Sequence, residues 1–192
     1  MTVEDRFNEQ YREGSAPWDI GKPDFNLIQA VTATPIAPCK TLEIGCGTGD
    51  NTIWLSQQGF LVVGVDASEI AIEKAREKTA NADVTCKYAV LNFLKSRVEG
   101  APFGFAFDRG CFHSLDSTRE RQTFAKQVNR HLSENGLWLS LMSRLSWKWK
   151  GRSTVKIAER AREETTKALQ RRREGRHFEA ALAGTGAGFQ AL

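Results

Sequence analysis

Two acidic residues and three glycines stand at positions where they could bind a charged ligand. In LEIGCGTGD (residues 42–50), Glu43 lies inside an apolar run that leads into Gly45, Gly47 and Gly49, a GxGxG spacing. Glycine weakens strands and helices, but it lets a backbone turn sharply and approach a ligand. Ligands of open α/β sheets bind beyond the carboxyl ends of the strands, where this loop is expected to lie. The stretch therefore predicts a ligand-binding loop.

The chemistry of that ligand follows from the two acids. Dinucleotide-binding loops have the spacing GxGxxG and receive a pyrophosphate at a helix N-terminus. Here the spacing is GxGxG, and Glu43 would disfavour a diphosphate and favour a cation such as an ammonium or a sulfonium. Asp66 ends the next apolar run, where a carboxylate can accept both hydroxyls of a ribose. Together these residues predict S-adenosylmethionine rather than NAD.

Alternating strands and helices must hold these residues in place. Apolar runs predict strands over residues 40–44, 60–68, 84–90 and 102–108, and a fifth after a turn within 133–142. Apolar spacing and capping residues, among them Ser68, predict helices over residues 1–13, 26–34, 51–58, 69–79 and 118–132. This alternation predicts an α/β fold, a Rossmann-like, doubly wound and mostly parallel sheet with helices on both faces.

The chain resembles the class I S-adenosylmethionine-dependent methyltransferases, and within them the thiopurine methyltransferase-like and tellurite-resistance-like small-molecule branch. The resemblance covers roughly residues 7–142, and the motifs that carry it are PWDIGKP (17–23), LEIGCGTGD (42–50), VVGVDAS (62–68), VLNFL (90–94) and FDRGCFHSL (107–115). It implies the class I methyltransferase fold and S-adenosyl-L-methionine as cofactor. It also implies in-line methyl transfer to a small molecule with a sulfur, selenium, tellurium, oxygen or nitrogen acceptor, without a metal.

The resemblance implies a role for each site residue. Glu43 and the glycine loop would hold the methionyl part, Asp66 the ribose, and Asn92 and Phe93 the adenine. Asn92 replaces the acid usual at its place, so it would accept from the adenine amino group without charge assistance. The expected cofactor-binding set is Trp18 from an N-terminal lid (residues 11–25), Glu43, Gly45, Cys46, Gly47, Asp66, Ala67, Asn92, Phe93 and Asp108. The catalytic candidates beside the acceptor are Arg109 and His113.

Composition predicts where the protein works and how it divides. Of 192 residues 41% are hydrophobic, no apolar run is long enough for a membrane helix, and the four cysteines are scattered, so we expect a cytoplasmic protein. The net charge of +4 is concentrated in the tail. We therefore expect a methyltransferase domain over residues 1–145 and a basic, helical or disordered tail over residues 146–192.

The tail carries the largest expected departure from the family. It shows no convincing strand pattern, so the last two strands usual in the family are expected to be missing, with a helix over residues 154–170 as one possibility. The fifth strand would then be an exposed edge. The tail is either a foreign or out-of-register sequence or a helical appendage that replaces the two strands.

The favoured prediction is an enzyme that methylates a small-molecule acceptor. One alternative is a catalytically impaired S-adenosylmethionine-binding relic with a foreign or truncated C-terminus. A nucleic-acid or protein methyltransferase that uses the basic tail is disfavoured, because the body is slightly acidic and lacks an NPPY-type motif. An NAD-dependent dehydrogenase is disfavoured by GxGxG and Glu43. We therefore expect neither nucleic acid nor a membrane as a partner.

Overall fold

The computed structural model describes residues 3–33, 36–143, 153–158, 181–182 and 190–191. The chain forms two compact units, Met1–Val98 and Glu99–Leu192, which are described separately. In the described residues, no helix has both the length and the apolar character that crossing a membrane requires.

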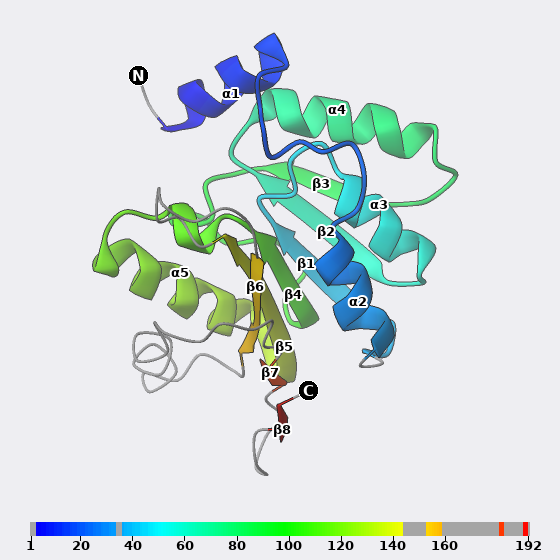
Figure 1. Cartoon of the computed structure of the whole chain (residues 1–192), viewed down its shortest axis with the longest axis vertical. Helices are drawn as coiled ribbons and strands as arrows, with labels where there is room; N and C mark the ends of the chain where they lie inside the picture. The colour runs from blue at the N-terminus through cyan, green and yellow to red at the C-terminus, as the bar shows by residue number, and fades with distance from the viewer. Residues whose placement is uncertain (1–2, 34–35, 144–152, 159–180, 183–189, 192) are drawn as a thin grey trace. The chain divides into compact units, whose positions relative to one another are not determined.

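The first unit is a parallel sheet with helices. Its elements are α1 (Val3–Glu13), α2 (Phe25–Ala33), β1 (Lys40–Ile44), α3 (Asp50–Gln57), β2 (Leu61–Asp66), α4 (Glu69–Ala80) and β3 (Lys87–Val90) (Figure 1). β2 pairs in parallel with β1 and with β3, and Asp66 lies opposite Val90. The carboxyl ends of the three strands therefore meet at one edge of this sheet.

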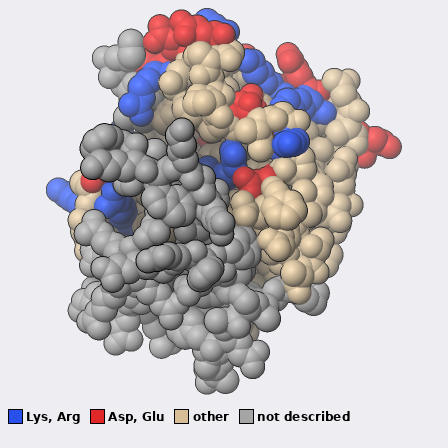
Figure 2. All heavy atoms as spheres, in the orientation of Figure 1, with Lys and Arg blue, Asp and Glu red and all other residues tan. Residues whose placement is uncertain are grey.

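Burial accounts for the apolar residues of β1 and β2. Leu42, Ile44, Val62 and Val65 are at most 3% exposed, as expected for parallel strands covered on both faces. The Ser68 side chain accepts a hydrogen bond from the Ala71 amide and caps α4, as its sequence position predicts. Over α1 and α4, Lys and Arg are interspersed with Asp and Glu on the face shown in Figure 2.

The second unit continues the strand and helix alternation. It contains β4 (Phe103–Arg109), the short helix η1 (Phe112–Ser114), α5 (Thr118–His131), β5 (Leu132–Ser143), β6 (Ser153–Ala158), β7 (Ala181–Leu182) and β8 (Gln190–Ala191). β4 and β5 are parallel, and β7 and β8 form a separate antiparallel pair. The side chains of Phe103, Phe105 and Phe107, all three in β4, are fully buried and form part of the apolar interior.

The predicted α/β, mostly parallel class is confirmed, but the prediction for the tail is wrong in one respect. β6 pairs antiparallel with β5, from Ser143 opposite Ser153 to Trp138 opposite Ala158, so this edge of β5 is covered. The helix expected from residue 154 is a strand as far as residue 158, and residues 159–170 lie outside the described residues. Polar and β-branched apolar residues alternate over TVKI (residues 154–157), which is a strand pattern that the composition of the surrounding segment obscures.

Candidate functional site

The glycine loop after β1 is fastened to the end of β2 by its own backbone. The amides of Gly45 and Cys46 donate to the Val65 carbonyl at 2.7 and 3.0 Å. The next amide, that of Gly47, donates to Asp66 Oδ2 at 2.9 Å. The loop is therefore preorganised, and a ligand that binds there meets a backbone whose course is already fixed.

Two glycines of the loop are required by packing as well as by backbone conformation. Gly47 and Gly49 have φ values of +53° and +86°, a region that favours glycine. A Cβ at Gly47 would lie 2.9 Å from the Tyr11 hydroxyl oxygen, and one at Gly49 would lie 2.8 Å from that of Tyr88. The missing side chains thus let Tyr11 of α1 and Tyr88 of β3 approach the loop.

Asp66 holds the ends of two loops together at the carboxyl end of β2. Its Oδ1 accepts from the Ser68 amide at 2.8 Å, while Oδ2 accepts from Gly47. Burial raises the pKa of Asp66, and hydrogen bonds from the backbone of Ser68, Gly47 and Ala67 oppose that shift. Since a carboxylate has roughly four acceptor positions and three backbone amides donate to this one, Asp66 can also receive a hydrogen bond from a ligand hydroxyl.

Glu43 is 1% exposed and contacts the first turn of α3. The Thr52 hydroxyl donates to Oε2, and Asn51 Nδ2 donates to Oε1 at 3.1 Å. Asn51 Oδ1 also accepts from the Asp24 amide at 2.8 Å, which connects this carboxyl group to the lid. Burial raises the pKa of Glu43 to about 8. Glu43 therefore lies behind the glycine loop, and its protonation state depends on the groups around it.

Trp18 forms part of an aromatic lid contact. Its indole Nε1 donates to the Tyr11 hydroxyl at 2.8 Å. The Trp18 ring meets the rings of Phe7 and Tyr11 edge to face, with centroids 5.6 and 6.1 Å apart. Trp18 packs on a small core of Tyr11, Ala16 and Ala71, so the lid is joined to α4 through apolar contacts.

A polar network that the sequence did not predict fixes the same loop from its other side. The Thr48 hydroxyl donates to Asp19 Oδ1 at 2.7 Å and accepts from Lys78 Nζ at 2.6 Å. Lys78 also donates to both oxygens of Asp50, at 3.0 and 2.9 Å. Threonine and lysine carry no distinctive spacing here, so only the fold reveals that they meet.

Asn92 and Phe93 lie in the turn after β3, next to the end of β2. The Leu91 amide donates to the Asp66 backbone carbonyl at 2.8 Å, which holds this turn beside Asp66. Phe93 is 7% exposed. Asn92 Oδ1 accepts from the Leu94 amide at 3.0 Å, while Asn92 Nδ2 donates to Glu4 Oε1 of α1 at 2.8 Å. Glu4 was not among the predicted residues.

The remaining predicted residues belong to the second unit. Asp108 is fully buried, and its carboxylate accepts from the Phe112 amide at 3.0 Å and from Trp138 Nε1 at 2.9 Å. Burial raises the pKa of Asp108 to about 6 and lowers that of the half-buried His113. Asp108 therefore fixes the turn that follows Arg109 and carries His113.

The comparisons with known proteins identify the family of the chain. Residues 41–136 match the family model described as a methyltransferase domain. An uncharacterized methyltransferase of Schizosaccharomyces pombe is 30% identical over 122 residues, which cover 61% of this chain and 83% of that protein. A probable thiol methyltransferase of Arabidopsis thaliana is 31% identical over 137 residues, which cover 71% of this chain and 60% of that protein.

Solved structures give the same result. A protein structure reported for the conversion of a disulfide bond into a thioacetal group during echinomycin biosynthesis has a TM-score of 0.67 and 26% identity, covering 73% of this chain and 60% of its own. The phosphoethanolamine N-methyltransferase 2 of Haemonchus contortus, in complex with S-adenosylhomocysteine, has a TM-score of 0.54 and 25% identity, covering 63% of this chain and 29% of its own. From the matched domain, the curated relatives and these structures, we conclude that the chain belongs to the class I S-adenosylmethionine-dependent methyltransferases.

Proposed function

We propose that the chain methylates the sulfur of a small thiol or of a thiolate-like anion. The observation that supports this most is the glycine loop tied to the half-buried carboxylate of Asp66 at the carboxyl end of β2. The acceptor class is suggested by the relatives, which include a probable thiol methyltransferase and a thiocyanate methyltransferase.

In this proposal, different residues of the first unit bind different parts of the cofactor. Asp66 accepts the ribose hydroxyls, and the backbone from Gly45 to Gly47 lies against the methionyl part. Trp18 covers the cofactor from the lid. Glu43, behind the loop, gains its negative charge more readily when a cation binds in front of it, because a nearby positive charge lowers a carboxyl pKa.

The chain contributes alignment and exclusion of water more than acid–base chemistry. Bound S-adenosylmethionine supplies a methyl group that is already activated by a positively charged sulfur. The acceptor sulfur forms a bond to the methyl carbon while the carbon–sulfonium bond breaks and its electron pair stays on the departing sulfur. A thiol is partly ionised near neutral pH, so it needs little help from a base. Arg109 and His113 stay our candidates for the acceptor side, because Arg109 ends β4 and His113 follows in η1.

Calorimetry on the purified full chain tests the cofactor half of the proposal. We expect S-adenosylhomocysteine to bind, and Asp66→Ala to weaken its binding by at least about tenfold, since hydrogen bonds to a charged group contribute on the order of 1.5–3 kcal/mol. Glu77→Ala, an exposed carboxylate on α4, is the matched control and should bind as the wild type does. Equal affinity in the wild type and Asp66→Ala would contradict the assigned ribose contact.

A methyl-transfer assay tests the acceptor half. We expect turnover with hydrosulfide, thiocyanate or a small aryl thiol, and much slower turnover with the phenol that matches the aryl thiol. Turnover confined to the phenol would overturn the sulfur assignment while leaving the cofactor site intact.

A further inference from the structure

One polar face of α1 contacts the turns after two neighbouring strands. Glu4 Oε1 accepts from Asn92 Nδ2 at 2.8 Å, in the turn after β3. One helical turn later, Asn8 Oδ1 accepts from the Ser68 hydroxyl at 2.7 Å, in the turn after β2. Residues four apart share a helix face, so these two contacts are made by the same side of α1.

The same face continues to the third strand. Tyr11, three residues after Asn8, places its hydroxyl beside Gly47 in the loop after β1. The spacing explains how a single helix contacts all three turns. Four and three residues of helix advance about 6 and about 4.5 Å, and neighbouring strands lie about 4.8 Å apart. α1 therefore lies across the carboxyl ends of β3, β2 and β1.

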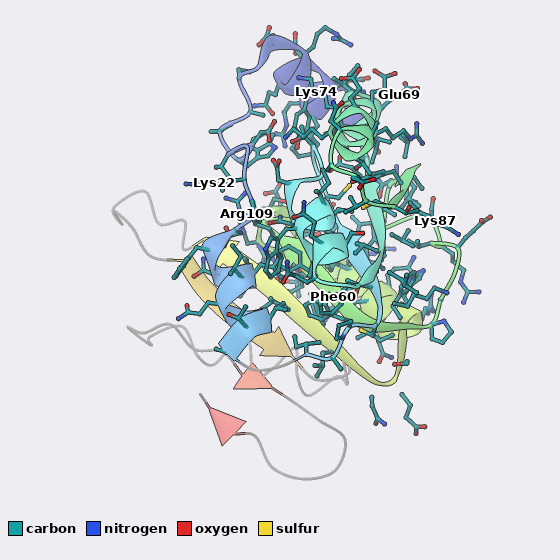
Figure 3. All side chains as sticks on the ribbon, turned by 90° about the vertical axis from the view of Figure 1, so that its right-hand side faces the viewer. Lys22, Phe60, Glu69, Lys74, Lys87 and Arg109 are labelled. Carbon is teal, nitrogen blue, oxygen red and sulfur yellow. The ribbon has the colours of Figure 1, made fainter. Side chains whose placement is uncertain are left out.

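Further contacts keep α1 in this place. The Lys74 ammonium of α4 donates to the Tyr11 backbone carbonyl, in the last turn of α1. Figure 3 shows Lys74 on the part of α4 that lies next to α1. A cation near a helix C-terminus is favourable, because the last carbonyl groups carry partial negative charge. Several contacts therefore hold α1, and with it Glu4, beside the carboxyl ends of the strands.

The Glu4–Asn92 contact determines which polar group lies next to a ligand at the turn after β3. The Asn92 amide uses its oxygen for the Leu94 amide and its nitrogen for Glu4, so a negative charge is supplied by α1 and not by the turn itself. A carboxylate that accepts from Asn92 has capacity for a second donor. The turn after β3 lies beside Asp66, since Asp66 and Val90 are opposite each other in neighbouring strands, so it is near enough to meet the base of a ribose bound at Asp66.

We propose that Glu4 accepts the hydrogen bond from the 6-amino group of the cofactor's adenine, and that α1 is therefore the element that distinguishes a 6-amino from a 6-oxo purine. The inference rests on the proposed cofactor site. A charged acceptor binds an amino donor more strongly than a neutral amide does. A 6-oxo base would instead bring a carbonyl oxygen against the carboxylate, and two acceptors cannot form a hydrogen bond with each other.

The test measures the affinities of the full chain for S-adenosylhomocysteine and for S-inosylhomocysteine, its 6-oxo analogue. We expect the wild type to prefer the 6-amino compound by about 10- to 100-fold, the range expected from one hydrogen bond to a charged group. Glu4→Gln should reduce this ratio to within about threefold, because a Gln amide can donate to a 6-oxo group. Glu9→Gln, an exposed position on another face of α1, should keep the wild-type ratio.

Exchanging the carboxylate of Glu4 and the amide of Asn92 separates recognition of the base from docking of α1. Asn92→Asp alone faces Glu4 with a second carboxylate and should weaken the binding of both compounds. The double variant Glu4→Gln/Asn92→Asp exchanges carboxylate and amide and should restore the preference for the 6-amino compound.

An unchanged ratio in Glu4→Gln, with S-adenosylhomocysteine still bound, would overturn the inference. Failure of the wild type to bind S-adenosylhomocysteine would instead overturn the proposed function.

Discussion

Glu43 shows how burial changes the chemistry of a residue whose place was predicted. Its position two residues before Gly45 was visible in the sequence, and it lies inside β1 as expected. Its partners Asn51 and Thr52 were not predictable, because which side chains of α3 face β1 depends on how the helix packs. The raised pKa follows from that packing, since removal from water penalises the charged form.

The protonation of Glu43 should make stability fall with rising pH. Its folded-state pKa of about 8 lies above the ordinary value of 4.5, so the folded state binds the proton more tightly. The resulting stabilisation is fully present below about pH 4.5 and is lost as the pH rises through about 8. We expect urea unfolding at pH 5, 6, 7 and 8 to show the wild type losing stability relative to Glu43→Gln.

The comparison isolates Glu43 because Asp66 and Asp108, whose pKa values are also raised, are present in both proteins. A stability difference between wild type and Glu43→Gln that stays constant over this pH range would show that Glu43 does not bind the proton more tightly on folding.

At the scale of elements, the glycine loop is determined as much by its neighbours as by its ligand. Gly49 precedes α3 with a left-handed φ, and α4 and β3 approach it closely through Ala75 and Tyr88. A GxGxG pattern alone predicts the turn but not this crowding, which depends on how α4 packs.

Gly49→Ala should therefore cost more than an ordinary glycine substitution. Its Cβ would lie 3.0 Å from that of Ala75 and 2.8 Å from the Tyr88 hydroxyl oxygen. Strain at positive φ and overpacking each cost about 1–3 kcal/mol, so we expect a loss of about 2–6 kcal/mol in thermal or urea unfolding. Gly14→Ala, at φ +68° with nothing within 4 Å of the new Cβ, should show the backbone cost alone. Equal losses of stability in the two variants would show that α4 and β3 move aside to make room for the new Cβ.

Most elements of the first unit were predictable because their signals are local. β1 has the predicted bounds, Lys40–Ile44, and Ser68 caps α4 as expected. β3 was predicted from Val84 but begins at Lys87, and the φ of +51° at Asp83 marks a turn before it. The contacts of α1 were not predictable, because Glu4 and Asn92 are far apart in the sequence.

For the molecule as a whole, β6 decides whether β5 has an open edge. An unpaired strand edge is a template for association with other chains. A chain ending at Ser143 lacks β6, so we expect it to form more high-molecular-weight material in size-exclusion chromatography than a chain ending at Ala158, which retains the β5–β6 pair. Equal monomer recovery for the two truncations would show that β6 does not protect this edge.

The contacts of α1 place a limit on the length of that helix. Each inserted residue turns the chain before it by about 100° around the helix axis relative to the chain after it. A single insertion between Glu4 and Asn8 would detach the turn after β3 or the turn after β2, whichever end of the helix stayed docked. In a related protein whose first helix has another number of residues between these two contacts, side chains at other helix positions must therefore contact the turns after the strands.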